Sequence, residues 1–141
     1  MKRVVARLRG RSRPDSPWSA IVGRGLPERK GDGPRVLCAT SVGGHGVARV
    51  VDSVVSMGLW LRGAQPSLLL CDSALPACEL CTYVQFPDVE EFFRAGPKAR
   101  LCEPCFATGS AAYAPLPVPL LRYRDFVSDA EIGAAQDESS T

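Results

Sequence analysis

The sequence predicts an α/β fold in which a small parallel sheet carries a cysteine-rich insertion. Two continuous apolar runs, residues 36–40 and 67–71, flank a segment with the apolar periodicity of a helix. Four of the six cysteines fall between residues 72 and 106, in two closely spaced pairs. At 141 residues, with 45% hydrophobic and 23% charged residues, the chain is long enough for one hydrophobic core. We therefore expect one folded domain.

Residues 1–34 form a basic leader that we expect to be mostly disordered. Residues 1–35 hold ten Lys and Arg against three Asp and Glu, a charge of +7, and the rest of the chain holds seven against twelve, a charge of −5. The leader is rich in Arg, Ser, Gly and Pro, and its one apolar patch, residues 18–22, is too small to form a core. Three interpretations stay open: a transit segment, an arm that contacts phosphates or anionic lipid, and a leader without function.

The first predicted element is a buried strand over residues 36–40, bounded by Pro34 and by glycines. After a glycine turn, a helix that ends at Gly63 carries an apolar face of the kind that normally packs on a core: Val47, Val50, Val51, Val54, Val55 and Gly58. Residues 67–71 then form a continuous apolar run, which is typical of a strand covered on both faces in a parallel sheet. The three elements make a βαβ unit, whose crossover should be right-handed.

The remaining elements are shorter. Residues 88–94 predict a short acidic helix ended by Gly96, residues 104–113 a further helix, and residues 118–123 a strand at a sheet edge. Ser128 followed by Glu131 predicts a helix cap. The chain is thus divided into the leader 1–34, a partial Rossmann-like α/β domain 35–127 with its cysteine-rich insert at 71–106, and a polar tail or truncated helix 128–141.

The turn after the first strand is the first candidate site. It holds Gly43, Gly44, His45 and Gly46, and His45 is the only histidine of the chain. Glycines let the backbone approach a ligand, and the following helix points unpaired N–H groups at it, which favours phosphate or pyrophosphate. The spacing of a dinucleotide fingerprint and the Lys of a P-loop are both missing, so neither NAD nor ATP is favoured. His45 is a candidate acid, base or phosphate ligand, and the alternative is a histidine that only caps the helix.

The cysteine pairs are the second candidate site. Cys78 and Cys81 are separated by two residues, as are Cys102 and Cys105, and twenty residues lie between the pairs. This spacing is typical of a tetrahedral zinc site, and four thiolates leave no place for a catalytic water, so the zinc would be structural. Cys71 could replace one of the four ligands. Thiols that bind no metal are the alternative.

Several segments together resemble a known family. "TSVGGHG", the valine-rich helix, "LLLCD", "CDSALPACELC" and "CEPCFATGSAAY" look like the amino-terminal domain of bacterial surface-carbohydrate, including capsular, glycosyltransferases of the GT-B type. The resemblance covers roughly residues 35–127. Related GlcNAc transferases carry a Gly-Gly-x-Gly-His turn, so the order Gly-Gly-His-Gly in this chain matches in part.

This resemblance implies an acceptor-side domain in surface-polysaccharide or glycoconjugate biosynthesis. Gly43, Gly44 and Gly46 would line the cleft near the donor pyrophosphate, with His45 as a catalytic or positioning group. The nucleotide-sugar and a glycan or lipid-linked acceptor would be bound together with a missing carboxyl-terminal domain or a partner subunit. Alone, the domain should have little or no transferase activity.

The alternative function is a zinc-stabilised, non-enzymatic binding module whose basic arm recognises nucleic acid or anionic membrane. The net charge of −5 over residues 36–141 argues against nucleic acid. No stretch approaches the about 20 apolar residues of a membrane-spanning helix, and no secretory signal opens the chain. We therefore expect a cytoplasmic protein, with peripheral contact at the inner face of the membrane left open.

Overall fold

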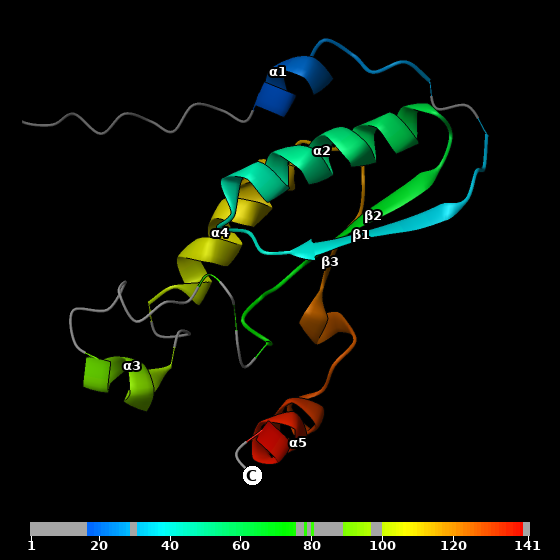
Figure 1. Ribbon diagram of the computed structural model, residues 1–141. Coiled ribbons are helices and arrows are strands. Elements are labelled where there is room, and N and C mark those ends of the chain that lie inside the picture. The colour runs from blue at the N-terminus through cyan, green and yellow to red at the C-terminus, as the bar shows by residue number, and fades with distance from the viewer. Residues whose placement is uncertain are drawn as a thin grey trace, which may run out of the picture.

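A computed structural model describes residues 17–28, 31–75, 78, 80, 89–96 and 100–139, and it has an α/β architecture (Figure 1). In chain order the elements are α1 (Pro17–Val22), β1 (Arg35–Ser41), α2 (Gly46–Leu61), β2 (Gln65–Leu70), α3 (Val89–Ala95), α4 (Cys102–Tyr113), β3 (Leu120–Arg122), a 3-10 turn (Tyr123–Asp125) and α5 (Asp129–Ser139). The part of the leader that spans residues 1–16 lies outside the described residues.

The three strands form one parallel sheet in the order β1-β2-β3, which confirms the predicted sheet and its edge strand. Cys38 of β1 pairs with Leu68 of β2, and Leu68 pairs with Leu120 of β3. Because all three strands run the same way, their carboxyl ends meet at one edge of the sheet. This is the edge where open α/β sheets normally bind ligands.

The core lies between the sheet and the helices α2 and α4, and consists of Met57, Leu68, Leu70, Tyr113 and Leu116. Trp18 of α1 and Leu26 pack against it, so the apolar patch of the leader does contribute to the fold. Along β2, buried residues alternate with half-buried ones, and Leu37 of β1 is 55% exposed. The expectation of a strand fully covered on both faces is therefore wrong.

Helix α2 packs with the face opposite to the expected one. Its buried residues are Asp52, Ser53, Ser56 and Met57, whereas the valines are exposed, from Val55 at 47% to Val47 at 70%. The buried polar groups have partners, as burial requires. The Tyr113 hydroxyl donates to Asp52 Oδ2 at 3.2 Å, and Ser56 Oγ donates to Cys38 Sγ at 3.4 Å. Apolar periodicity correctly located this helix but not the side that faces the sheet.

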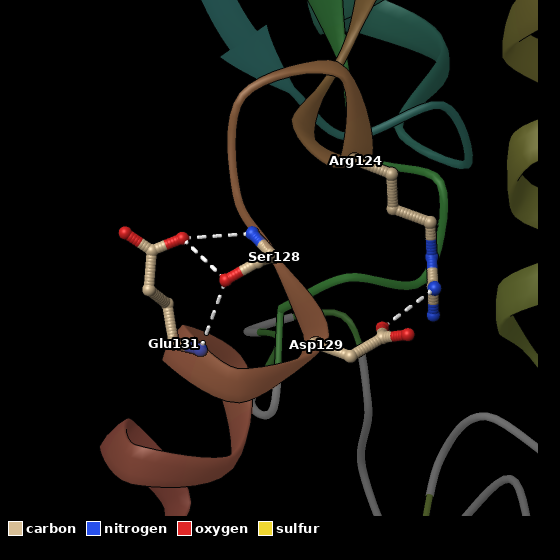
Figure 2. Close-up of polar contacts among 4 residues, drawn as sticks. All are labelled: Arg124, Ser128, Asp129 and Glu131. Atoms are coloured by element: carbon tan, nitrogen blue, oxygen red, sulfur yellow. Dashed lines mark hydrogen bonds and ion pairs between the residues drawn. The ribbon is translucent and has the colours of Figure 1, made fainter.

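The cap predicted at Ser128 is present and starts the eleven-residue helix α5 (Figure 2). Glu131 Oε2 accepts the Ser128 N–H at 2.8 Å and the Ser128 hydroxyl at 2.7 Å, and the Glu131 N–H donates back to Ser128 Oγ at 3.3 Å. These bonds from Ser128 lower the pKa of Glu131. Arg124 adds an ion pair with Asp129 at 3.0 Å. In Figure 1, α3 and α5 stand away from the layer formed by α2 and the sheet.

In the described part of the chain, no helix has both the length and the apolar character needed to cross a membrane.

Candidate functional site at the carboxyl edge of the sheet

The glycine turn leaves β1 at the carboxyl edge of the sheet and leads directly into α2. His45 is the N-cap residue of α2, with extended backbone angles, φ −84° and ψ 101°. Its Nδ1 accepts the N–H of Ala48 at 3.0 Å. In a neutral imidazole whose Nδ1 accepts a hydrogen bond, the proton sits on Nε2. His45 is exposed, so the capped ring can offer an Nε2–H donor to a ligand, whereas a base would need the other tautomer.

The backbone N–H groups of the turn divide into used and available donors. The Gly44 N–H donates to Cys105 Sγ at 2.9 Å, and the His45 N–H faces the Val42 carbonyl at 3.4 Å. Gly46 and Val47 are the first two residues of α2 and have no intrahelical acceptor for their N–H groups. These two donors, at the positive end of a sixteen-residue helix, are the ones suited to an anion.

Gly43 differs from the other two glycines of the turn because it is buried and lies against α4. A Cβ at Gly43 would collide with the carbonyl oxygen of Cys105, and one at Gly109 would lie 2.7 Å from Gly43 Cα. Gly43 is therefore needed for the close approach of two backbones. Gly44 and Gly46 are exposed.

Arg49 is a functional candidate that the sequence analysis missed. Its guanidinium donates from Nη1 to the Thr108 carbonyl at 3.2 Å, and Nη2 would lie 3.7 Å from a Cβ added at Gly46. Its Nε is buried without a hydrogen-bond partner among the described residues. The sequence spacing could have identified Arg49, because it follows Gly46 by three residues and so lies on the same helix face.

Two further buried polar atoms lack a hydrogen-bond partner within the described part of the chain. One is Oδ1 of Asp72, which follows β2 at the carboxyl edge, and the other is Oγ of Ser110 in α4. Buried polar atoms are normally paired, by protein, water or ligand. Asp72 therefore adds a carboxylate acceptor at the end of the strand next to the glycine turn.

The structure brings several of the cysteines toward one another. Helix α4 begins at Cys102, two residues before its predicted start, so Cys102 and Cys105 lie one helical turn apart. Burial raises the pKa of Cys102 above 9.0, a hydrogen bond from Ser73 opposes this, and the nearby thiols of Cys71, Cys78 and Cys105 raise it further.

Three of the four predicted zinc ligands, Cys78, Cys102 and Cys105, are among the described residues. In residues 17–28, 31–75, 78, 80, 89–96 and 100–139, no three His, Cys, Asp or Glu side chains are grouped so that they could hold a metal ion. Cys81, one of the four predicted ligands, lies outside those ranges. The described thiols, Cys38, Cys71, Cys78, Cys102 and Cys105, are free rather than disulfide-bonded. Free thiols remain compatible with metal binding, since the thiolate is the ligand.

Comparison with family models, curated proteins and solved structures finds no match to this chain.

Proposed function

We propose that this chain is the acceptor-side domain of a GT-B type glycosyltransferase that acts in surface-polysaccharide or glycoconjugate biosynthesis. The observation that carries the proposal is the place of the glycine turn, between the carboxyl end of a parallel strand and the start of a long helix. The resemblance of "TSVGGHG" and of the cysteine-rich segments supplies the reaction class. A second domain or a partner subunit would supply most of the nucleotide-sugar site. The chain alone would therefore have little or no transferase activity.

The residues at the turn have distinct roles under this proposal. The N–H groups of Gly46 and Val47 hold a pyrophosphate oxygen, and the Arg49 guanidinium neutralises its charge. His45 positions the phosphate or the acceptor hydroxyl through its Nε2–H, because its Nδ1 already accepts from Ala48. Gly43 keeps the turn against α4 and has no direct role toward the ligand.

Anion binding is tested by titrating the ¹⁵N-labelled protein with inorganic pyrophosphate and with UDP, using uridine as the uncharged control. We expect saturable shifts of the Gly46 and Val47 amides, with a dissociation constant on the order of 1 mM or below, that weaken as salt is raised. Arg49→Gln should weaken binding about tenfold. The matched control Arg62→Gln, at the other end of α2, should leave it unchanged. Absence of binding to the unmodified chain, or equal binding of uridine, contradicts the proposal.

We also propose that the insert holds one structural zinc through Cys78, Cys81, Cys102 and Cys105. Support comes from the spacing of the two pairs, from the placement of Cys102 and Cys105 on one turn of α4, and from the proximity of Cys78 to Cys102. Cys71 is the replacement ligand, because it too lies near Cys102.

Metal content and thiol titration test this second proposal. The expected result is about one zinc per chain, with four thiols that react only after a chelator is added. Cys71→Ser and Cys81→Ser identify the fourth ligand, since only the true ligand's loss should release the metal. Six freely reacting thiols and no metal contradict the proposal and leave the binding-module alternative without its zinc as well.

A further inference from the structure

Helix α4 holds the glycine turn by three contacts. Cys105 Sγ accepts the Gly44 N–H at 2.9 Å, the Cys105 carbonyl lies against Gly43, and Gly109 lies against the Cα of Gly43. A Cβ at Gly44 would meet Leu80 Cδ1 at 3.3 Å and Cys105 Sγ at 3.4 Å. The turn is therefore contacted by residues from the insert and from α4, more than 30 residues away along the chain.

Two successive glycines need such contacts to keep one conformation. Glycine loses more backbone freedom on ordering than any other residue, so the turn is costly to hold in a single shape. The hydrogen bond to sulfur fixes the direction of the Gly44 N–H, and with it the plane of the peptide between Gly43 and Gly44. The Gly46 and Val47 donors follow two and three residues later, on the first turn of α2.

We propose that Cys105 is a positioning residue of the phosphate-binding turn, so that the cysteine-rich segment controls the affinity of the turn for phosphate. Its sulfur takes up the Gly44 N–H and leaves the Gly46 and Val47 donors, together with Arg49, to face the anion. Any change at this sulfur is then transmitted to the anion site without contact between Cys105 and the ligand. The inference rests on the proposed function and specifies its regulation.

The test uses three variants of the full chain and two measurements. Cys105→Ala removes the acceptor, Cys105→Ser restores an oxygen acceptor on a shorter side chain, and Ala107→Ser changes an exposed side chain of the same helix without altering its charge. The first measurement is the hydrogen-exchange rate of the Gly44 amide without ligand, and the second is the affinity for inorganic pyrophosphate. Because Cys105 is also a predicted zinc ligand, all the proteins are measured after treatment with a chelator, so that none of them holds metal.

We expect Cys105→Ala to speed Gly44 exchange and to weaken pyrophosphate binding about tenfold, with partial recovery of both in Cys105→Ser and no change in Ala107→Ser. Unchanged Gly44 exchange in Cys105→Ala, or an equal effect in Ala107→Ser, overturns the inference. A simple loss of folding would speed exchange throughout the sheet, and Leu68 serves as the reference amide for this. If the unmodified chain binds no pyrophosphate, the proposed function fails, while Gly44 exchange still decides whether Cys105 positions the turn.

Discussion

At the scale of single residues, the contact between Gly43 and Gly109 leaves the least room for a side chain. A Cβ at Gly109 would lie 2.7 Å from Gly43 Cα and 2.9 Å from Leu70 Cδ1, both closer than van der Waals contact allows. The backbones on the two sides belong to the glycine turn and to α4, so relief requires that these elements separate. The contact between Gly43 and Gly109 therefore joins the glycine turn to the core residue Leu70.

We predict that Gly109→Ala destabilises the protein by about 2 kcal/mol, because overpacking outweighs the better helix propensity of alanine. The matched control is Gly58→Ala in α2, where a Cβ would meet only Arg62 Nη1 at 3.9 Å. This control should gain about 0.5–1 kcal/mol. Urea denaturation measures both, and equal shifts of the two midpoints would contradict the packing described.

Tyr113 gives the protein a predicted dependence on alkaline pH. Burial, together with the nearby negative charge of Asp52, raises the pKa of Tyr113 far above the ordinary value of 10.0. The folded state thus keeps the proton while the unfolded chain loses it, so the stabilisation is complete below pH 10.0 and declines as the pH rises beyond that value. Tyr113→Phe should flatten this decline and cost about 1–2 kcal/mol at pH 7. The denaturation midpoints of the unmodified protein and of Tyr113→Phe are measured between pH 8 and about pH 11. Parallel pH profiles of the two proteins would refute the prediction.

At the scale of elements, the sequence located nearly every helix and strand. Apolar runs bounded by Pro and Gly located β1 and β2, and the Ser128 cap located the start of α5. What it could not supply is which side of α2 faces the sheet, because periodicity shows only that two faces differ. The orientation of α2 depends on tertiary contacts. Tyr113 and Cys38 come from distant segments and form hydrogen bonds with the buried polar residues of α2.

The orientation of α2 predicts opposite effects for two neighbouring substitutions. Val54 is 56% exposed and Met57 is 3% exposed. Val54→Ser should therefore change the free energy of unfolding by less than about 0.5 kcal/mol. Met57→Ala should cost about 2–4 kcal/mol, because it opens a cavity in the core. If chemical denaturation showed Val54→Ser to be the costlier change, α2 would face the sheet with its valines instead.

The candidate site could be predicted only in part from the sequence, again because it depends on contacts between distant segments. Spacing within the chain points to the turn and to the cysteine pairs, since both are local patterns. The hydrogen bond between Gly44 and Cys105 joins residues 61 positions apart, and Arg49 reaches Thr108 across 59 positions. No local pattern encodes such contacts. Gly43 was consequently grouped with ligand-lining glycines, although the structure uses it for packing.

At the scale of the whole molecule, the free energy of local opening should be highest in β2 and should fall with distance from this strand. This strand is paired on both sides and supplies the buried Leu68 and Leu70, whereas α5 leads away from the sheet beyond β3 (Figure 1). Local opening needs least energy where few apolar contacts hold an element. Hydrogen exchange should find the slowest amides in β2 and much faster ones in α5, and comparable protection of the two would contradict this order.

The exposed valines of α2 have a practical consequence for work with the purified protein. Val47, Val50, Val51, Val54 and Val55 present a continuous apolar ridge to water on the fully folded chain. Native protein should therefore bind a dye such as ANS and be retained on a phenyl column in ammonium sulfate, and substituting Val51 and Val54 by Ser should reduce both. Dye fluorescence, usually taken as a sign of lost tertiary packing, would in this protein report an intact helix surface.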